Sequence, residues 1–294
     1  MTSTLAEPPE AGSAPEGRPV RIEGGPRPLF GILSLPARHE PAPLVVLAHG
    51  FKGFMEWGFF PSLADLLTGR GIATLRFGFS GNGMRPGDDL VTDLESFRRN
   101  TFSREVEDLL AVVTHGPALA PERIDDARVG VLGHSRGGGM AVLATSRDEG
   151  RRRIRALVTW NAIGTVDRLP AEEVARWRLE GTYWVENART GQRLPLGTEL
   201  LDDVECHRGE LDVARAAASR EAPWLIVHGA DDETVPVGEA RALAAEARDP
   251  VELAVVAAGG HTFGATHPFH GPTPPLVEAM NRSQAWFRRW LKAD

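Results

Sequence analysis

Residues 130–143 read GVLGHSRGGGMAVL: an apolar run, a serine among glycines, and then small and apolar residues. This order predicts a buried strand, a tight turn and a helix, with Ser135 at the turn. Gly133 and Gly137 let the backbone pass the turn without a Cβ clash, and the G-x-S-x-G spacing is typical of a nucleophilic serine held above a sheet edge. A serine that merely caps a glycine-rich helix start is the alternative interpretation.

The rest of the chain alternates short apolar runs with longer amphipathic segments. This alternation predicts a mostly parallel, doubly wound α/β sheet with helices on both faces, preceded by a hairpin around Gly24, Gly25 and Pro26. In the segment SREVEDLLAVVTHG we expect Ser103 to be the helix N-cap, because its side chain precedes an apolar helical stripe. The predicted parallel strands are PLVVLAHG, GIATLRF, ARVGVLGH, IRALVTWNA, PWLIVHG and VELAVVAA.

The alternation is interrupted at residues 164–221, a segment too long for an ordinary connection. It contains a helical pattern, PAEEVARWRLEG, and two β-like runs separated by ARTG that indicate a hairpin. We interpret it as a cap inserted into one α/β core formed by residues 19–163 and 222–294. Residues 1–18, rich in Pro, Ala and Glu, are predicted to be a disordered tail.

Composition narrows the classes of partner. The chain of 294 residues has a formal net charge of −7, which argues against a nucleic-acid or anionic-membrane partner. Cys206 is the one cysteine, so an intrachain disulfide is excluded, and the histidines lack metal-ligand spacing. We expect a cytoplasmic protein that needs no metal or cofactor and acts on a small molecule, with a homodimer as a candidate assembly.

A nucleophilic serine needs an acid and a base, in the chain order Ser, Asp or Glu, His. The segment HGADDETVPV follows a predicted strand and offers Asp231 and Asp232. We favour Asp232, three residues before Val235, because Pro236 is expected near the first position of the next helix. Asp231 remains the alternative acid.

The predicted base is His261, which follows the last strand in a glycine-rich loop, GGHTFG. His267 and His270 are alternatives farther from the strand end. The oxyanion hole requires one amide after the nucleophile and one from the loop after an early strand. Arg136 and Phe51 are expected to supply these two N–H groups.

Other histidines and several aromatic residues are less clearly linked to function. We interpret His49, His134 and His228, which lie at strand ends, as structural. Three aromatic residues of the inserted segment are expected to form a wall of the substrate pocket, although they could instead attach the cap to the core. They are Trp177, Tyr183 and Trp184.

These motifs resemble, in order, those of the α/β-hydrolase superfamily, and more narrowly its dienelactone-hydrolase-like and serine-esterase branches. The pairing of HGF with GHSRGG, together with an insertion before PWLIVHG, is similar to the feruloyl and cinnamoyl esterase type. Dienelactone hydrolases use a cysteine nucleophile, so Ser135 puts that chemistry in doubt and the resemblance implies cleavage of carboxylic esters. A peptidase or amidase with the same triad, or a ligand-binding module on the same fold, are the alternatives. The matching segments are HGFKGF, LRFGFSGNG, GVLGHSRGG, IVHGADDETVP and GGHTFG.

Overall fold

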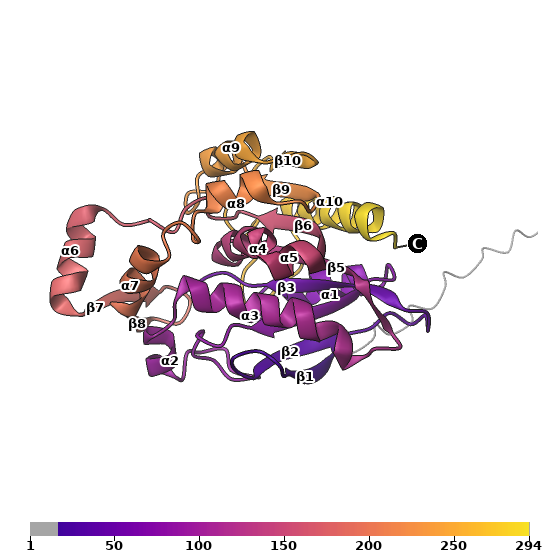
Figure 1. Cartoon of the computed structure of the whole chain (residues 1–294), viewed down its shortest axis with the longest axis horizontal. Helices are drawn as coiled ribbons and strands as arrows, with labels where there is room; N and C mark the ends of the chain where they lie inside the picture. The colour runs from indigo at the N-terminus through magenta and orange to yellow at the C-terminus, as the bar shows by residue number, and fades with distance from the viewer. Residues whose placement is uncertain (1–16, 294) are drawn as a thin grey trace, which may run out of the picture.

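An eight-stranded sheet forms the centre of the computed structural model, which describes residues 17–293 (Figure 1). The strand order is β1-β2-β4-β3-β5-β6-β9-β10. Strands β1 and β2 are antiparallel to their neighbours. The other strands of this sheet, β4, β3, β5, β6, β9 and β10, are parallel to one another. The predicted mostly parallel α/β sheet is therefore confirmed. The strands are β1 (Arg18–Ile22), β2 (Leu29–Ser34), β3 (Ala42–Ala48), β4 (Ala73–Gly78), β5 (Ile124–His134), β6 (Ile154–Trp160), β9 (Trp224–Gly229) and β10 (Val251–Val256).

Helices cover both faces of the sheet, because its central strands are apolar on both sides. Every residue of β3 and of β9 is buried. Helices α1 (Phe60–Thr68) and α10 (Pro274–Leu291) pack on one face. Helices α3 (Phe102–His115), α4 (Arg136–Ser146), α8 (Val213–Ser219) and α9 (Val237–Glu246) pack on the other. The shorter helices are α2 (Leu94–Arg98), η1 (Gly116–Leu119) and α5 (Asp148–Arg153).

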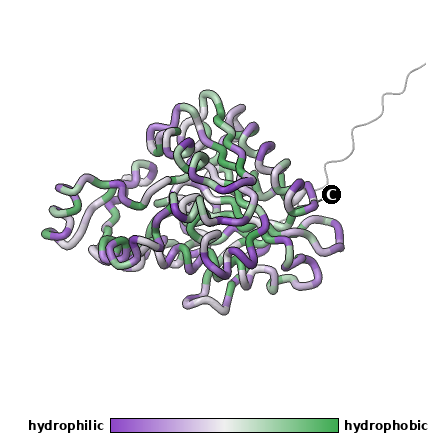
Figure 2. Tube along the Cα trace, turned by 45° about the horizontal axis from the view of Figure 1, so that its top comes forward, coloured by the Kyte–Doolittle hydropathy of each residue, from purple (hydrophilic) through white to green (hydrophobic). Residues whose placement is uncertain are grey.

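Hydropathy follows this layering. Figure 2 shows hydrophobic segments gathered in the interior and hydrophilic ones along the outer turns.

Among residues 17–293, no helix combines the length and the hydropathy that crossing a membrane requires.

The start of α3 differs from the prediction. Thr101, not Ser103, is the N-cap: its hydroxyl oxygen accepts a hydrogen bond from the Arg104 amide at 3.2 Å. Phe102 is buried in the core and is already the first residue of the helix. Ser103 therefore lies inside the helix and cannot cap it. The Ser103 amide instead donates to Asp203 Oδ2 at 3.0 Å.

The inserted segment forms a protruding unit that extends to the left in Figure 1. It consists of α6 (Ala171–Glu180), a hairpin of β7 (Thr182–Asn187) and β8 (Gln192–Gly197), and α7 (Glu199–Cys206). We call residues 171–206 the cap. The predicted end of the insertion at residue 221 is too late, because α8 packs against α4 and α9 of the core.

The first strand begins at Arg18, one residue before the predicted start of the core at residue 19. Residues 1–16 of the predicted tail lie outside the described residues, and Arg18 already pairs with Leu33 as the first residue of β1.

Candidate active site

Ser135 occupies the turn between β5 and α4 with a strained backbone, φ 56° and ψ −123°. Non-glycine residues rarely adopt such positive φ values, and they cluster at functional sites. The Ser135 amide donates to the Trp160 carbonyl at 2.8 Å, which holds the turn against the end of β6. A Cβ on Gly133 would lie 2.4 Å from the Gly137 carbonyl oxygen, and one on Gly137 would lie 2.3 Å from that of His49. Both glycines are therefore required by close backbone packing.

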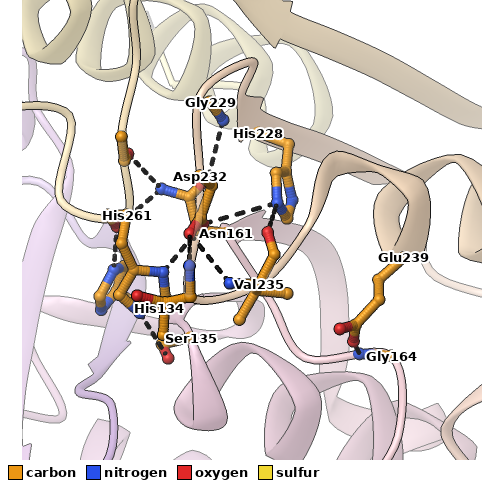
Figure 3. Close-up of polar contacts among 12 residues, drawn as sticks. His134, Ser135, Asn161, Gly164, His228, Gly229, Asp232, Val235, Glu239 and His261 are labelled. Carbon is orange, nitrogen blue, oxygen red and sulfur yellow. Dashed lines mark hydrogen bonds and ion pairs between the residues drawn. The ribbon is translucent and has the colours of Figure 1, made fainter.

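Three of the predicted side chains form one hydrogen-bonded chain (Figure 3). His261, in the loop after β10, places Nε2 2.9 Å from Ser135 Oγ and Nδ1 2.8 Å from Asp232 Oδ2. Asp232 lies in the loop after β9. The alternative acid, Asp231, is exposed and makes no such contact. The structure thus brings together the nucleophile, base and acid expected from the sequence.

Asp232 is held as an anion. Its side chain is fully buried, and Oδ1 accepts from the Thr234 and Val235 amides, each at 2.9 Å. Burial is the largest single influence and would raise the pKa of Asp232, but the hydrogen bonds from His261 and the two amides together lower that pKa below its usual value. A carboxylate at Nδ1 fixes that nitrogen as the donor, which leaves Nε2 free to accept the Ser135 proton.

Two further side chains fix the backbone of His261. Asn161 Nδ2 donates to the His261 carbonyl oxygen at 2.7 Å, and His134 Nε2 donates to the same oxygen at 2.8 Å. Asn161 Oδ1 accepts from the Gly229 amide at 2.7 Å, so this residue also joins the ends of β6 and β9. Sequence reasoning missed Asn161; a polar residue directly after the apolar run IRALVTW was the available signal.

The three histidines interpreted as structural, His49, His134 and His228, hold loops in place through hydrogen bonds. Burial keeps His49 and His134 neutral. Burial lowers the pKa of His49 to about 4 and that of His134 to about 3. His49 bridges Gly50 to the start of the loop after β4 through the Phe79 amide, and His228 donates to the Val235 carbonyl at 2.8 Å.

The two alternatives to His261 as base lie outside the hydrogen-bonded chain. His267 Nδ1 accepts from the Gly58 amide at 3.1 Å, and His270 is exposed.

The two residues predicted to supply the oxyanion donors, Phe51 and Arg136, line the same cavity as Ser135. Phe51 lies in a turn closed by the Gly53 amide and the Gly50 carbonyl at 3.0 Å, and Arg136 is the first residue of α4. Within residues 17–293 neither the Phe51 nor the Arg136 amide donates to a protein acceptor. Free amides at a helix N-terminus favour developing negative charge.

A cavity of about 520 Å³ opens between Ser135 and the cap. Trp177 and Tyr183 line it, as expected, with their rings 5.2 Å apart. The expectation for Trp184 is wrong: this side chain is 48% exposed and carries the Arg193 guanidinium on its ring, 5.1 Å from the centroid. Successive residues of β7 point to opposite sides, so Trp184 lies outside when Tyr183 lies inside. Further apolar lining residues are Ile163, Val166, Leu169, Val174, Val185, Leu196, Leu200, Leu201 and Val204.

Within the described part of the chain, no group of three or more His, Cys, Asp and Glu side chains is placed to hold a metal ion.

Comparison with known proteins decides the family. Residues 39–194, more than half of the chain, match the family described as serine aminopeptidase, S33. The chain belongs to this S33 family of serine hydrolases. A relative from Escherichia coli, the uncharacterized 31.7 kDa protein in the traX-finO intergenic region, is 26% identical over 232 residues, which are 68% of this chain and 76% of that protein.

Solved structures show the same fold. Est1E from Butyrivibrio proteoclasticus with ferulic acid bound has a TM-score of 0.70 and 22% identity, covering 93% of this chain and 99% of that one. A puromycin-hydrolyzing peptidase of Mycobacterium tuberculosis has a TM-score of 0.67 and 20% identity, covering 98% of this chain and 42% of that one. The predicted α/β-hydrolase fold is confirmed, and the S33 chain is a hydrolase.

Proposed function

We propose that this S33 hydrolase cleaves carboxylic esters through a covalent acyl-enzyme. The observation that carries the proposal is the unbroken hydrogen-bonded chain from Asp232 through His261 to Ser135. A nucleophile, a base, an orienting acid and oxyanion donors are the groups that acyl transfer through a covalent intermediate requires.

In the first half-reaction, Ser135 Oγ attacks the acyl carbon while His261 Nε2 takes its proton. The negative charge that develops on the carbonyl oxygen is bound by the Phe51 and Arg136 amides. Asp232 stabilises the imidazolium, which then protonates the leaving alcohol. In the second half-reaction, His261 deprotonates a water molecule that attacks the acyl-enzyme, and Ser135 is released with the acid product.

The two acidic side chains that line the cavity are each paired with an arginine. Binding an ammonium group calls for an available carboxylate. Of the acidic side chains that line the cavity, Asp167 lies 3.4 Å from Arg208 and Glu205 lies 2.9 Å from Arg178. An aminopeptidase remains the second candidate, supported by the family match and by the likeness to the mycobacterial peptidase.

The test combines active-site labelling with two matched substrate panels. We expect a fluorophosphonate probe to label wild-type protein and not Ser135→Ala, with both proteins equally folded by circular dichroism. Turnover of p-nitrophenyl esters should exceed that of aminoacyl p-nitroanilides. Faster anilide cleavage would favour the aminopeptidase, and labelling without turnover on either panel would contradict the ester hydrolase.

A further inference from the structure

The side chain of Arg136 forms a structured group inside the cavity, separate from the role of its backbone amide. Its guanidinium lies between two aromatic rings, 5.1 Å from the Phe51 centroid and 4.1 Å from the Phe102 centroid. Its Nε donates to Glu105 Oε2 at 2.8 Å, and Glu105 Oε1 accepts from Asn100 at 2.6 Å. The Arg136 and Glu105 side chains are only 8% and 6% exposed. Stacking and ion pairing together hold the guanidinium in one orientation.

The outer end of this guanidinium has unused hydrogen-bond donors. Within residues 17–293 neither Nη1 nor Nη2 donates to a protein acceptor, and Nη2 is buried as well. Arg136, Phe51 and Phe102 line the cavity into which Ser135 opens. Nη2 has almost no accessible surface, so Nη1 is the donor that this fixed cation can offer to the cavity in which the substrate must lie.

The hydrogen-bond requirement of Nη1 determines which substrates fit. A hydrocarbon group that fills the cavity displaces water from Nη1 and leaves this charged donor unsatisfied, whereas a group with a suitably placed oxygen replaces the lost hydrogen bond. The acceptor should be uncharged, because Glu105 already compensates the charge of Arg136. A second carboxylate would bring net negative charge into a cavity lined mostly by apolar side chains.

We propose that the Arg136 side chain determines specificity by binding an uncharged oxygen acceptor, such as a ketone, ether or hydroxyl oxygen, on the part of the ester that enters the cavity. This inference rests on the proposed function, because it places that oxygen on a substrate of Ser135. It narrows the substrate class from apolar esters in general to esters that carry a second oxygen group.

The test is an oxygen scan with isosteric substrates. In one series of p-nitrophenyl esters the acyl chain carries an ether or ketone oxygen at successive positions, and in a second series of acetate esters the alcohol carries it. At the favoured position we expect kcat/KM to exceed that of the hydrocarbon isostere by about 10- to 100-fold, the range for a hydrogen bond to a charged group. A carboxylate at that position should give no advantage.

Variants assign the selectivity to the guanidinium. Arg136→Met, and the double variant Arg136→Met with Glu105→Leu that removes both charges, should bring the oxygen-to-hydrocarbon ratio close to one. Both keep the backbone amide of residue 136. Arg193→Met, the same change on the outer face of the cap, is the matched control and should keep the wild-type ratio.

Three outcomes would overturn the inference. Equal kcat/KM values for the oxygen-bearing and hydrocarbon substrates in the wild-type protein would overturn it, whether or not the variants fold. A preference for the oxygen-bearing substrate that persists in Arg136→Met would also overturn it. A preference for the carboxylate would contradict the uncharged acceptor. Ester turnover without any preference for the oxygen-bearing substrates would contradict this inference alone. The absence of ester turnover would contradict the proposed function as well.

Discussion

The side chain of Asn161 donates to the His261 carbonyl oxygen at 2.7 Å, across 100 residues of sequence. The same side chain accepts from the Gly229 amide, so one amide group joins the ends of β6 and β9 and the loop after β10. Asn161 has φ 48°, a left-handed conformation that asparagine tolerates better than most residues. The position of the imidazole therefore depends on Asn161, which makes no hydrogen bond to the nucleophile.

Replacing Asn161 by Asp tests this positioning role. Aspartate can still accept from Gly229 but cannot donate to His261. We expect kcat to fall by about 10- to 100-fold with little change in KM, because a displaced base weakens proton transfer more than substrate binding. Steady-state kinetics on one p-nitrophenyl ester, with melting temperatures for both proteins, provide the measurement. Wild-type kcat in Asn161→Asp would show that the His134 hydrogen bond positions His261 alone.

The two adjacent aspartates should behave very differently. Asp232→Asn removes the anion at His261 Nδ1 and disfavours the reactive tautomer, so turnover should fall by about three to four orders of magnitude. Asp231→Asn is the matched control, since its exposed side chain makes no contact with the imidazole. Comparable losses in the two variants would contradict the observed geometry.

Aromatic residues of the cap offer a second matched pair. Tyr183→Ala enlarges the cavity and should raise KM for bulky aryl esters more than for acetate esters, by up to about 10- to 200-fold, the usual limit for a hydrophobic wall. Trp184→Ala, one residue away on the outer face, should leave both KM values near those of the wild type. A uniform loss on both esters with a lower melting temperature would indicate that Tyr183 only stabilises the cap.

Acid should destabilise the protein through its buried histidines. The pKa of His134 is lowered to about 3 in the folded chain by burial, against about 6.5 unfolded. Between these values the unfolded state binds more protons, so the free energy of unfolding falls as pH falls, by roughly 3 kcal/mol between pH 6.5 and pH 4. Urea unfolding across this range should show a shallower pH slope for His134→Gln than for wild type. His39→Gln, at an exposed site, is the control and should keep the wild-type slope.

The sequence alone predicted the parallel sheet and the candidate reacting groups. Apolar runs predicted the parallel strands, and Ser135 and His261 were singled out because each lies in the turn or loop that follows a strand. Such signals are local: strand period, glycine at a crowded turn, and the rule that parallel strands end at one edge of the sheet. The preference for Asp232 over Asp231 also came from spacing to Pro236, and the contacts of Asp232 agree with it.

Tertiary structure decided which side chains face the site and what holds them. The side of β7 that faces the cavity depends on how the hairpin packs, so Trp184 could not be distinguished from Tyr183 by composition. Thr101 replaced Ser103 as the N-cap because burial of Phe102 set the start of α3. The contacts of Asn161 with His261, and the placement of Arg136 between Phe51 and Phe102, join segments far apart in sequence. Such long-range contacts exist only once the sheet has brought its strand ends together, and no local pattern encodes them.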